Sequence, residues 1–141
     1  MSKSDAPIPI AGFDHISIAV PDLDAATELY RTKFGCVVSE PIDIPKQGIR
    51  MAYVDLGNAK IELMQPLDQS SPIAKFLERN PAGGIHHFCM TTADANSAAV
   101  AATAADMRVL ADPTPGHHGR QLFFLHPKDS LGTLIEIEET E

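Results

Sequence analysis

A chain of 141 residues that is 44% hydrophobic is long enough for one domain with an apolar core and too short for two ordinary domains. Its net charge of -8 repels polyanions, which excludes nucleic acid as an expected partner. The longest apolar runs, such as residues 122–125, fall far short of the roughly 20 residues that a membrane helix needs, so no membrane partner is expected. The 2 cysteines lie too far apart for a zinc ribbon or a redox pair and fit a reducing cytosol, so we expect a cytoplasmic protein.

The predicted elements fall into two halves. Residues 1–11 have no apolar stretch before a cleavage site and predict a disordered leader, which precedes a single domain over residues 12–139. The first half predicts a strand over residues 13–20, a helix over residues 25–34, and strands over residues 37–44, 49–56 and 60–64. Ser71-Pro72 then begins a helix over residues 73–79, inside a linker over residues 70–82. The second half predicts a strand that contains His87, a helix over residues 95–105, and strands over residues 109–110, 121–125 and 134–138.

The two halves are repeats of each other. Residues 12–16, GFDHI, match residues 84–88, GIHHF, at a shift of 72 residues. At the same shift, Asp22 and Asp94 each precede a helix at the N-cap position, where a carboxylate accepts hydrogen bonds from the first backbone N–H groups. The sequence therefore predicts an α+β fold of two βαβββ modules, residues 12–67 and 84–139.

The first and last strands of each module carry a predicted metal site. Strand residues alternate between faces, so each of these strands presents one ligand-type side chain on the face opposite its aliphatic neighbours. The four residues are His15 and Glu62 in the first module and His87 and Glu136 in the second, spaced by 47 and 49 residues. If two modules pack with these faces together, the two imidazoles and two carboxylates converge. That set excludes a closed structural zinc site and suits a divalent ion with positions left for substrate; we expect cobalt, with zinc, manganese or nickel as alternatives.

Four stretches carry a resemblance to a known family: FDHISIAVPDL at residues 13–23, SPIAKFLE at residues 71–78, GIHH at residues 84–87 and FLHPKD at residues 124–129. With them, nearly the whole chain resembles the methylmalonyl-CoA epimerases of the vicinal oxygen chelate superfamily, which has a glyoxalase/dioxygenase-like fold of paired βαβββ modules. The resemblance implies an isomerase that removes and returns the C2 proton of an acyl-CoA. It also implies a homodimer.

The resemblance assigns roles to individual residues. The family's metal ligands match the four residues named above, and Glu136 also matches a catalytic base. Some epimerases carry a second glutamate where this chain has Met51. We therefore hypothesise that Glu62 loosens from the ion to serve as the second base. Lys46 is the alternative candidate for that base. The residues expected to contact the substrate are Lys46, Gln47, His118 and Lys128.

Two other functions compete with this interpretation. Lactoylglutathione lyase, glyoxalase I, uses the same arrangement of metal ligands and also moves a proton next to a carbonyl. A metal-free module that sequesters a ligand would share the fold without the chemistry. The linker helix and the FLHPKD segment favour the epimerases over the first alternative, and the four intact ligand positions disfavour the second.

Overall fold

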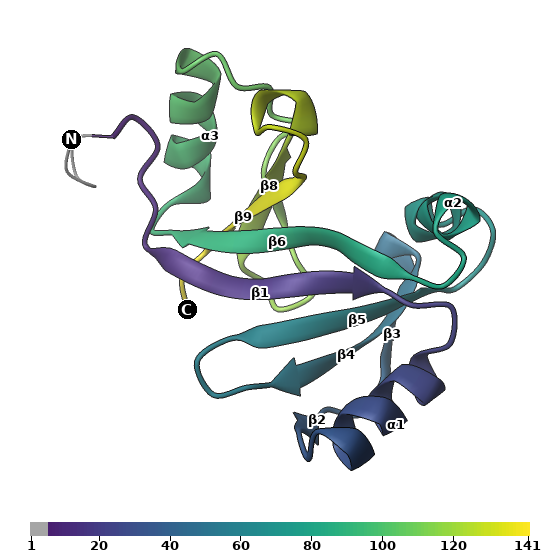
Figure 1. Cartoon of the computed structure of the whole chain (residues 1–141). Coiled ribbons are helices and arrows are strands. Elements are labelled where there is room, and N and C mark those ends of the chain that lie inside the picture. Colours follow the sequence, from purple (N-terminus) through teal and green to yellow (C-terminus); the bar gives the residue numbers. More distant parts are fainter. Residues whose placement is uncertain (1–5) are drawn as a thin grey trace. The chain divides into compact units, whose positions relative to one another are not determined.

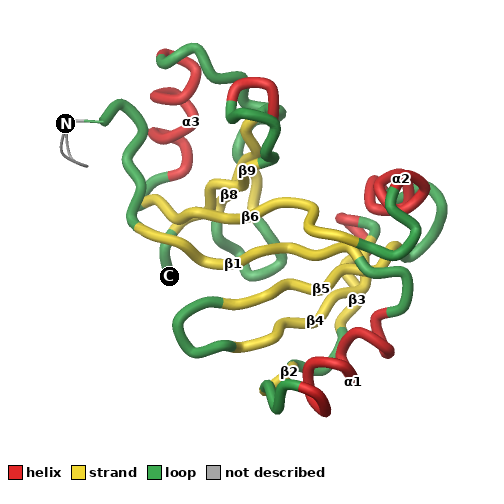
Figure 2. The backbone as a smooth tube through the Cα atoms, viewed as in Figure 1, coloured by secondary structure: helices red, strands yellow, loops and turns green. Residues whose placement is uncertain are grey.

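The structure, a computed structural model, describes residues 6–141 and contains two compact units (Figures 1 and 2). Residues 15–86 form one, which we call the N-unit. Residues 87–141, with the described residues before position 15, form the other, the C-unit. The two boundaries, between residues 14 and 15 and between residues 86 and 87, each fall inside the first strand of a predicted module.

The N-unit has the predicted βαβββ order followed by the linker helix. Its elements are β1 (Gly12–Ala19, which begins in the C-unit), α1 (Leu23–Lys33), β2 (Val37–Val38), β3 (Ile42–Ile44), η2 (Pro45–Gln47), β4 (Ile49–Asp55), β5 (Lys60–Pro66) and α2 (Pro72–Arg79). The strands follow the order β2-β4-β5-β1, with β3 also paired to β4, and β1 runs parallel to β5. The strand predicted over residues 37–44 is thus divided into β2 and β3.

The C-unit repeats this order. Its elements are β6 (Gly84–Thr92, which begins in the N-unit), α3 (Ala95–Ala104), β7 (Thr114–Pro115), β8 (Gln121–Leu125), η3 (Pro127–Asp129) and β9 (Ile135–Glu139). The strand order is β6-β9-β8-β7, with β6 parallel to β9. The predicted strand at residues 109–110 is reduced to a single bridge between Val109 and Leu125, and β7 takes its place in the topology. The α+β fold class is confirmed.

Local side-chain caps fix where the helices begin. Asp22 accepts a hydrogen bond from the backbone N–H of Ala25 at 3.1 Å, and Asp94 accepts one from Ser97 at 3.0 Å. Ser71 caps α2 in the same way, with Pro72 as the first helical residue. All three predicted caps are confirmed.

Each unit buries its aliphatic side chains between the sheet and a helix. In the N-unit, Leu23 of α1 packs with Val54 and Leu63, and in the C-unit the alanines of α3 pack with Phe123 and Ile137. The aliphatic neighbours of Glu62 and Glu136, at residues 61, 63, 135 and 137, therefore lie in these cores. The other face of the N-unit sheet is not open along its full length, because Ile73 of α2 covers one end of it.

The segment before β1 is ordered where the structure describes it. Ile8 and Ile10 pack against the C-unit core, and the Pro9 carbonyl accepts a hydrogen bond from Thr92 Oγ1 at 2.7 Å. The prediction of a disordered leader is therefore wrong for residues 8–11. It stays a prediction for residues 1–5, which lie outside the described residues. Within residues 6–141, none of the helices has the length and apolar character needed to cross a membrane.

Candidate functional site

The N-unit contributes His15 and Glu62 from neighbouring parallel strands. The β1–β5 register places Ser17 opposite Glu62 and His15 opposite Lys60, so His15, Ser17 and Glu62 share one face. His15 is 3% exposed and Ser17 is fully buried. Ser17 Oγ donates a hydrogen bond to Glu62 Oε1 at 3.0 Å, which fixes the orientation of this carboxylate.

The C-unit contributes the repeat-related pair, His87 and Glu136. A hydrogen bond of 2.9 Å joins His87 Nε2 to Glu136 Oε1, and each residue is only 5% exposed. The edge of the His87 ring contacts Phe124, with the ring centroids 5.1 Å apart. A histidine and a carboxylate are thus held together on a buried sheet face, where water does not solvate them.

These two pairs suit a divalent ion. Each unit offers one imidazole and one carboxylate, the donors that borderline divalent metals bind. Two ligands on one such ion lie roughly 3 Å apart, given metal–ligand bonds of about 2.1 Å. The His87 and Glu136 donor atoms already have this separation, at 2.9 Å. The residues present therefore fit the group that the sequence predicts.

A second buried carboxylate, Glu138, was missed by sequence reasoning. It is 2% exposed and lies on the same face as Glu136. Arg120 Nη1 lies 2.7 Å from Glu138 Oε1, and His118 Nε2 lies 3.2 Å from the same oxygen. The ligand atoms of Asp14, Cys89 and Glu138 all lie within 4.8 Å of one another. Strand alternation from Glu136 to Glu138 is the signal that could have found it, but the prediction takes only one ligand from each strand.

His118 is committed to this network through both ring nitrogens. Its Nδ1 accepts a hydrogen bond from the Arg120 backbone N–H at 3.0 Å, so Nε2 is the nitrogen that faces Glu138. Burial, and after it the positive charge of Arg120, lowers the pKa of His118 from 6.5 to about 4. His118 is therefore neutral at pH 7. Its predicted contact with substrate stays a prediction.

The other predicted substrate contacts lie on short surface turns. Lys46 and Gln47 are exposed in η2, and Lys128 is exposed in η3. Gly48 ends η2 with a φ of 70°, a conformation that favours glycine. Met51, at the position where the resemblance implies a glutamate in some epimerases, is fully buried in an apolar cluster and offers no acid or base.

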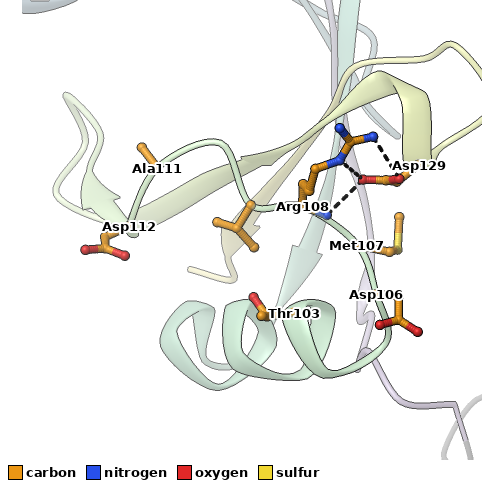
Figure 3. Close-up of a pocket in the computed structure, with 8 residues that line it drawn as sticks. Thr103, Asp106, Met107, Arg108, Ala111, Asp112 and Asp129 are labelled. Atoms are coloured by element: carbon orange, nitrogen blue, oxygen red, sulfur yellow. Dashed lines mark hydrogen bonds and ion pairs between the residues drawn. The ribbon is translucent and has the colours of Figure 1, made fainter.

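A surface cavity of about 670 Å³ lies elsewhere in the C-unit (Figure 3). Its lining, as far as residues 6–141 show it, includes none of the predicted site residues. The figure shows Arg108 and Asp129 joined across one side, with Arg108 Nε 2.8 Å from Asp129 Oδ2. This ion pair ties the segment after α3 to η3, so its role is structural.

Asp129→Asn should reduce stability in a pH-dependent way. Hydrogen bonds from Arg108, the side chain first and the backbone N–H second, lower the pKa of Asp129 from 3.8 to about 2. Since the folded pKa lies below the unfolded value, the carboxylate stabilises the fold above pH 4 and loses this effect as the pH falls through about 2. We expect Asp129→Asn to melt below the parent protein at pH 7, with the difference closing between pH 4 and pH 2. Melting curves for Asp129→Asn and for the exposed control Asp112→Asn test this, and a pH-independent difference would contradict it.

The chain is similar to known proteins over most of its length. Residues 14–124 match the Glyoxalase/Bleomycin resistance protein/Dioxygenase superfamily. The chain is 47% identical to the ethylmalonyl-CoA/methylmalonyl-CoA epimerase of Cereibacter sphaeroides, over 92% of this chain and 98% of the relative. Among solved structures it is similar to the methylmalonyl-CoA epimerase of Mycobacterium tuberculosis, with a TM-score of 0.86 and 34% identity over 97% of this chain and 91% of the other. A Streptomyces coelicolor methylmalonyl-CoA epimerase variant in complex with 2-nitronate-propionyl-CoA gives a TM-score of 0.84 and 35% identity over 93% of this chain and 98% of the other.

Proposed function

This chain belongs to the methylmalonyl-CoA epimerases, within the glyoxalase, bleomycin resistance protein and dioxygenase superfamily, and on that premise we propose that it interconverts (2R)- and (2S)-methylmalonyl-CoA. The observation that supports this most is the buried His87–Glu136 pair, at the position where the epimerase resemblance expects a metal ligand beside a catalytic base. Identity to epimerases over most of the chain favours this function over lactoylglutathione lyase.

We propose that His15, Glu62, His87 and Glu136 together hold one divalent ion. The two modules supply matching halves, from one chain or from two copies in a homodimer. The ion would supply Lewis-acid stabilisation of the negative charge that develops on the substrate oxygens. Cobalt is our first choice of metal, with zinc, manganese and nickel as alternatives for the same donors.

The carboxylates of Glu62 and Glu136 would remove and return the proton. Removal of the C2 proton leaves a planar carbon, and inversion is easiest when one group works on each face of it. We propose Glu136 for one face and Glu62 for the other. Met51 is buried among apolar side chains and offers no acid or base, and Lys46 is exposed in η2, so the half-buried Glu62 is the candidate that remains in the N-unit.

Glu62→Gln tests this assignment of the second face. Glutamine keeps the size of the side chain and an oxygen that can accept from Ser17, but it cannot take a proton. We expect inversion to fall about 100-fold at equal metal content. The rate of epimerisation, measured after metal analysis, decides the point: a variant that binds metal and keeps nearly full activity rules out Glu62 as a base.

The function itself is tested on the parent protein in heavy water. Metal-loaded protein should incorporate deuterium at C2 of methylmalonyl-CoA and invert that centre, both followed by NMR and a chiral assay. Exchange and inversion together support the proposal. Metal-loaded protein that neither exchanges nor inverts methylmalonyl-CoA, yet converts the hemithioacetal of methylglyoxal and glutathione, would point to lactoylglutathione lyase.

We propose further that the protein works as a homodimer in the cytoplasm. The dimer rests on the family resemblance, and sedimentation analysis would detect it. Cys36 and Cys89 are free thiols, which agrees with a reducing compartment. Ethylmalonyl-CoA is a second candidate substrate, because the Cereibacter relative carries it in its name. The kcat/KM values for the two acyl-CoA esters would compare them.

A further inference from the structure

The two halves of the predicted site hold their carboxylates in different ways. In the C-unit, Glu136 is held by His87, which is itself a proposed metal ligand. In the N-unit, Glu62 is held by Ser17, a hydroxyl that belongs to no proposed ligand set. The halves are therefore related by sequence repeat but are not chemically equivalent.

Cys89 stands at the equivalent position of the other module, and its contacts differ from those of Ser17. It stands at the position of Ser17 in the repeat, 72 residues later, and the β6–β9 register places it opposite Glu136 as Ser17 is placed opposite Glu62. Its sulfur nevertheless lies 3.5 Å from the Met90 carbonyl and 3.8 Å from Glu138 Oε2. A thiol is also a weak donor. The repeat position of Ser17 thus carries a hydroxyl in one module and a thiol, the weaker donor, in the other.

From this asymmetry we infer that Ser17 is a positioning residue that holds Glu62 ready for proton transfer. This inference rests on the proposed function. Ser17 is fully buried, and its hydrogen bond to Oε1 holds the Glu62 carboxylate from one side. A carboxylate that loosens from an ion on a buried face loses its main electrostatic partner. The Ser17 hydroxyl stabilises the ionised carboxylate there and keeps it in one orientation.

The ratio of C2 deuterium exchange to inversion measures this role. From the epimer whose C2 proton faces Glu136, that glutamate removes the proton, and deuterium then returns from either face. Weakening Glu62 favours return by Glu136, which gives exchange without inversion. From the other epimer Glu62 removes the proton, and return by Glu136 is inversion, so the same change slows both processes and does not raise their ratio.

Ser17→Ala should raise the exchange-to-inversion ratio about tenfold or more from one epimer and should not raise it from the other. Ser17→Cys keeps a weak donor at similar size, so its ratio should lie between those of the parent protein and Ser17→Ala. Cys89→Ala is the matched control at the equivalent position of the other module, and it should leave both ratios unchanged. Bound metal and melting temperature are measured on every variant.

The outcomes separate this inference from the proposed function. A one-sided rise at unchanged metal content supports Ser17 as a positioning residue. Ratios that stay unchanged from both epimers in Ser17→Ala, or loss of its metal, overturn the inference, because Ser17 would then support only the fold or the ion. If the parent protein itself neither exchanges nor inverts, the proposed function fails whatever Ser17 does.

Discussion

Glu136→Gln should lower the rate of C2 inversion about 1,000-fold without unfolding the protein. Glutamine has nearly the same volume as glutamate, and its amide oxygen can still accept a hydrogen bond from His87 Nε2, which lies 2.9 Å from Glu136 Oε1. It cannot, however, accept the C2 proton. At equal metal content, inversion should be nearly lost from both epimers. Deuterium exchange should be nearly lost only from the epimer whose C2 proton faces Glu136, because Glu62 can still remove and return the proton of the other.

Glu139→Gln provides the control for this substitution. Glu139 lies on the same strand but on the other face, where its carboxylate accepts hydrogen bonds from the backbone N–H groups of Ala95 and Gln121. Its loss affects packing, so activity at a temperature well below melting should remain near that of the parent. A Glu136→Gln variant that carries metal and keeps more than a tenth of the parent rate would remove Glu136 from the proposed chemistry.

Metal removal should abolish activity and lower the melting temperature. Without the ion, the four proposed ligands lose the positive charge that would neutralise their two carboxylates. An ion present at 100 times its Kd adds about 2.7 kcal/mol of stability. Dialysis against a chelator should therefore eliminate inversion, and cobalt, zinc, manganese or nickel should restore it to different degrees. Activity, metal content and melting temperature are measured before metal removal, after it and after metal is added back.

Histidine substitutions show whether the ion binds where we propose. His87→Ala should neither retain metal nor recover activity when metal is added back. His126→Asn removes an imidazole that caps η3 and belongs to no proposed ligand set. Asparagine can replace it as a cap, so this variant should bind metal normally. Full activity in the chelated parent protein would contradict a metal-assisted reaction.

Sequence patterns predicted those parts of the fold that depend on neighbouring residues. The caps at Asp22, Ser71 and Asp94 are local, and so is the alternation that places Glu62 and Glu136 opposite their aliphatic neighbours. The leader was predicted wrongly beyond residue 7, because Ile8 and Ile10 are ordered by a core formed mostly by residues 90–137. Nothing in a short window of sequence reveals such packing.

The contacts of the site also required information that sequence patterns do not carry. Alternation gives the face of Ser17, but only the β1–β5 register shows that Glu62 is its partner. His118 and Arg120 lie in and after a loop, and their approach to Glu138 depends on how that loop folds back over β9. The residue types of His118 and Arg120 do not reveal which carboxylate they approach, so the buried network was not predicted.

The Arg120–Glu138 pair constrains how this protein can change during evolution. Glu138 is 2% exposed, and loss of Arg120 alone would leave a negative charge in the protein interior without its nearest cation. Loss of Glu138 alone would leave the guanidinium without its carboxylate. Selection should therefore remove single substitutions at either position, whereas it can retain double replacements by apolar residues of similar volume. Across natural homologues, the two positions should covary, and the intermediates with only one of the two charges should be rare.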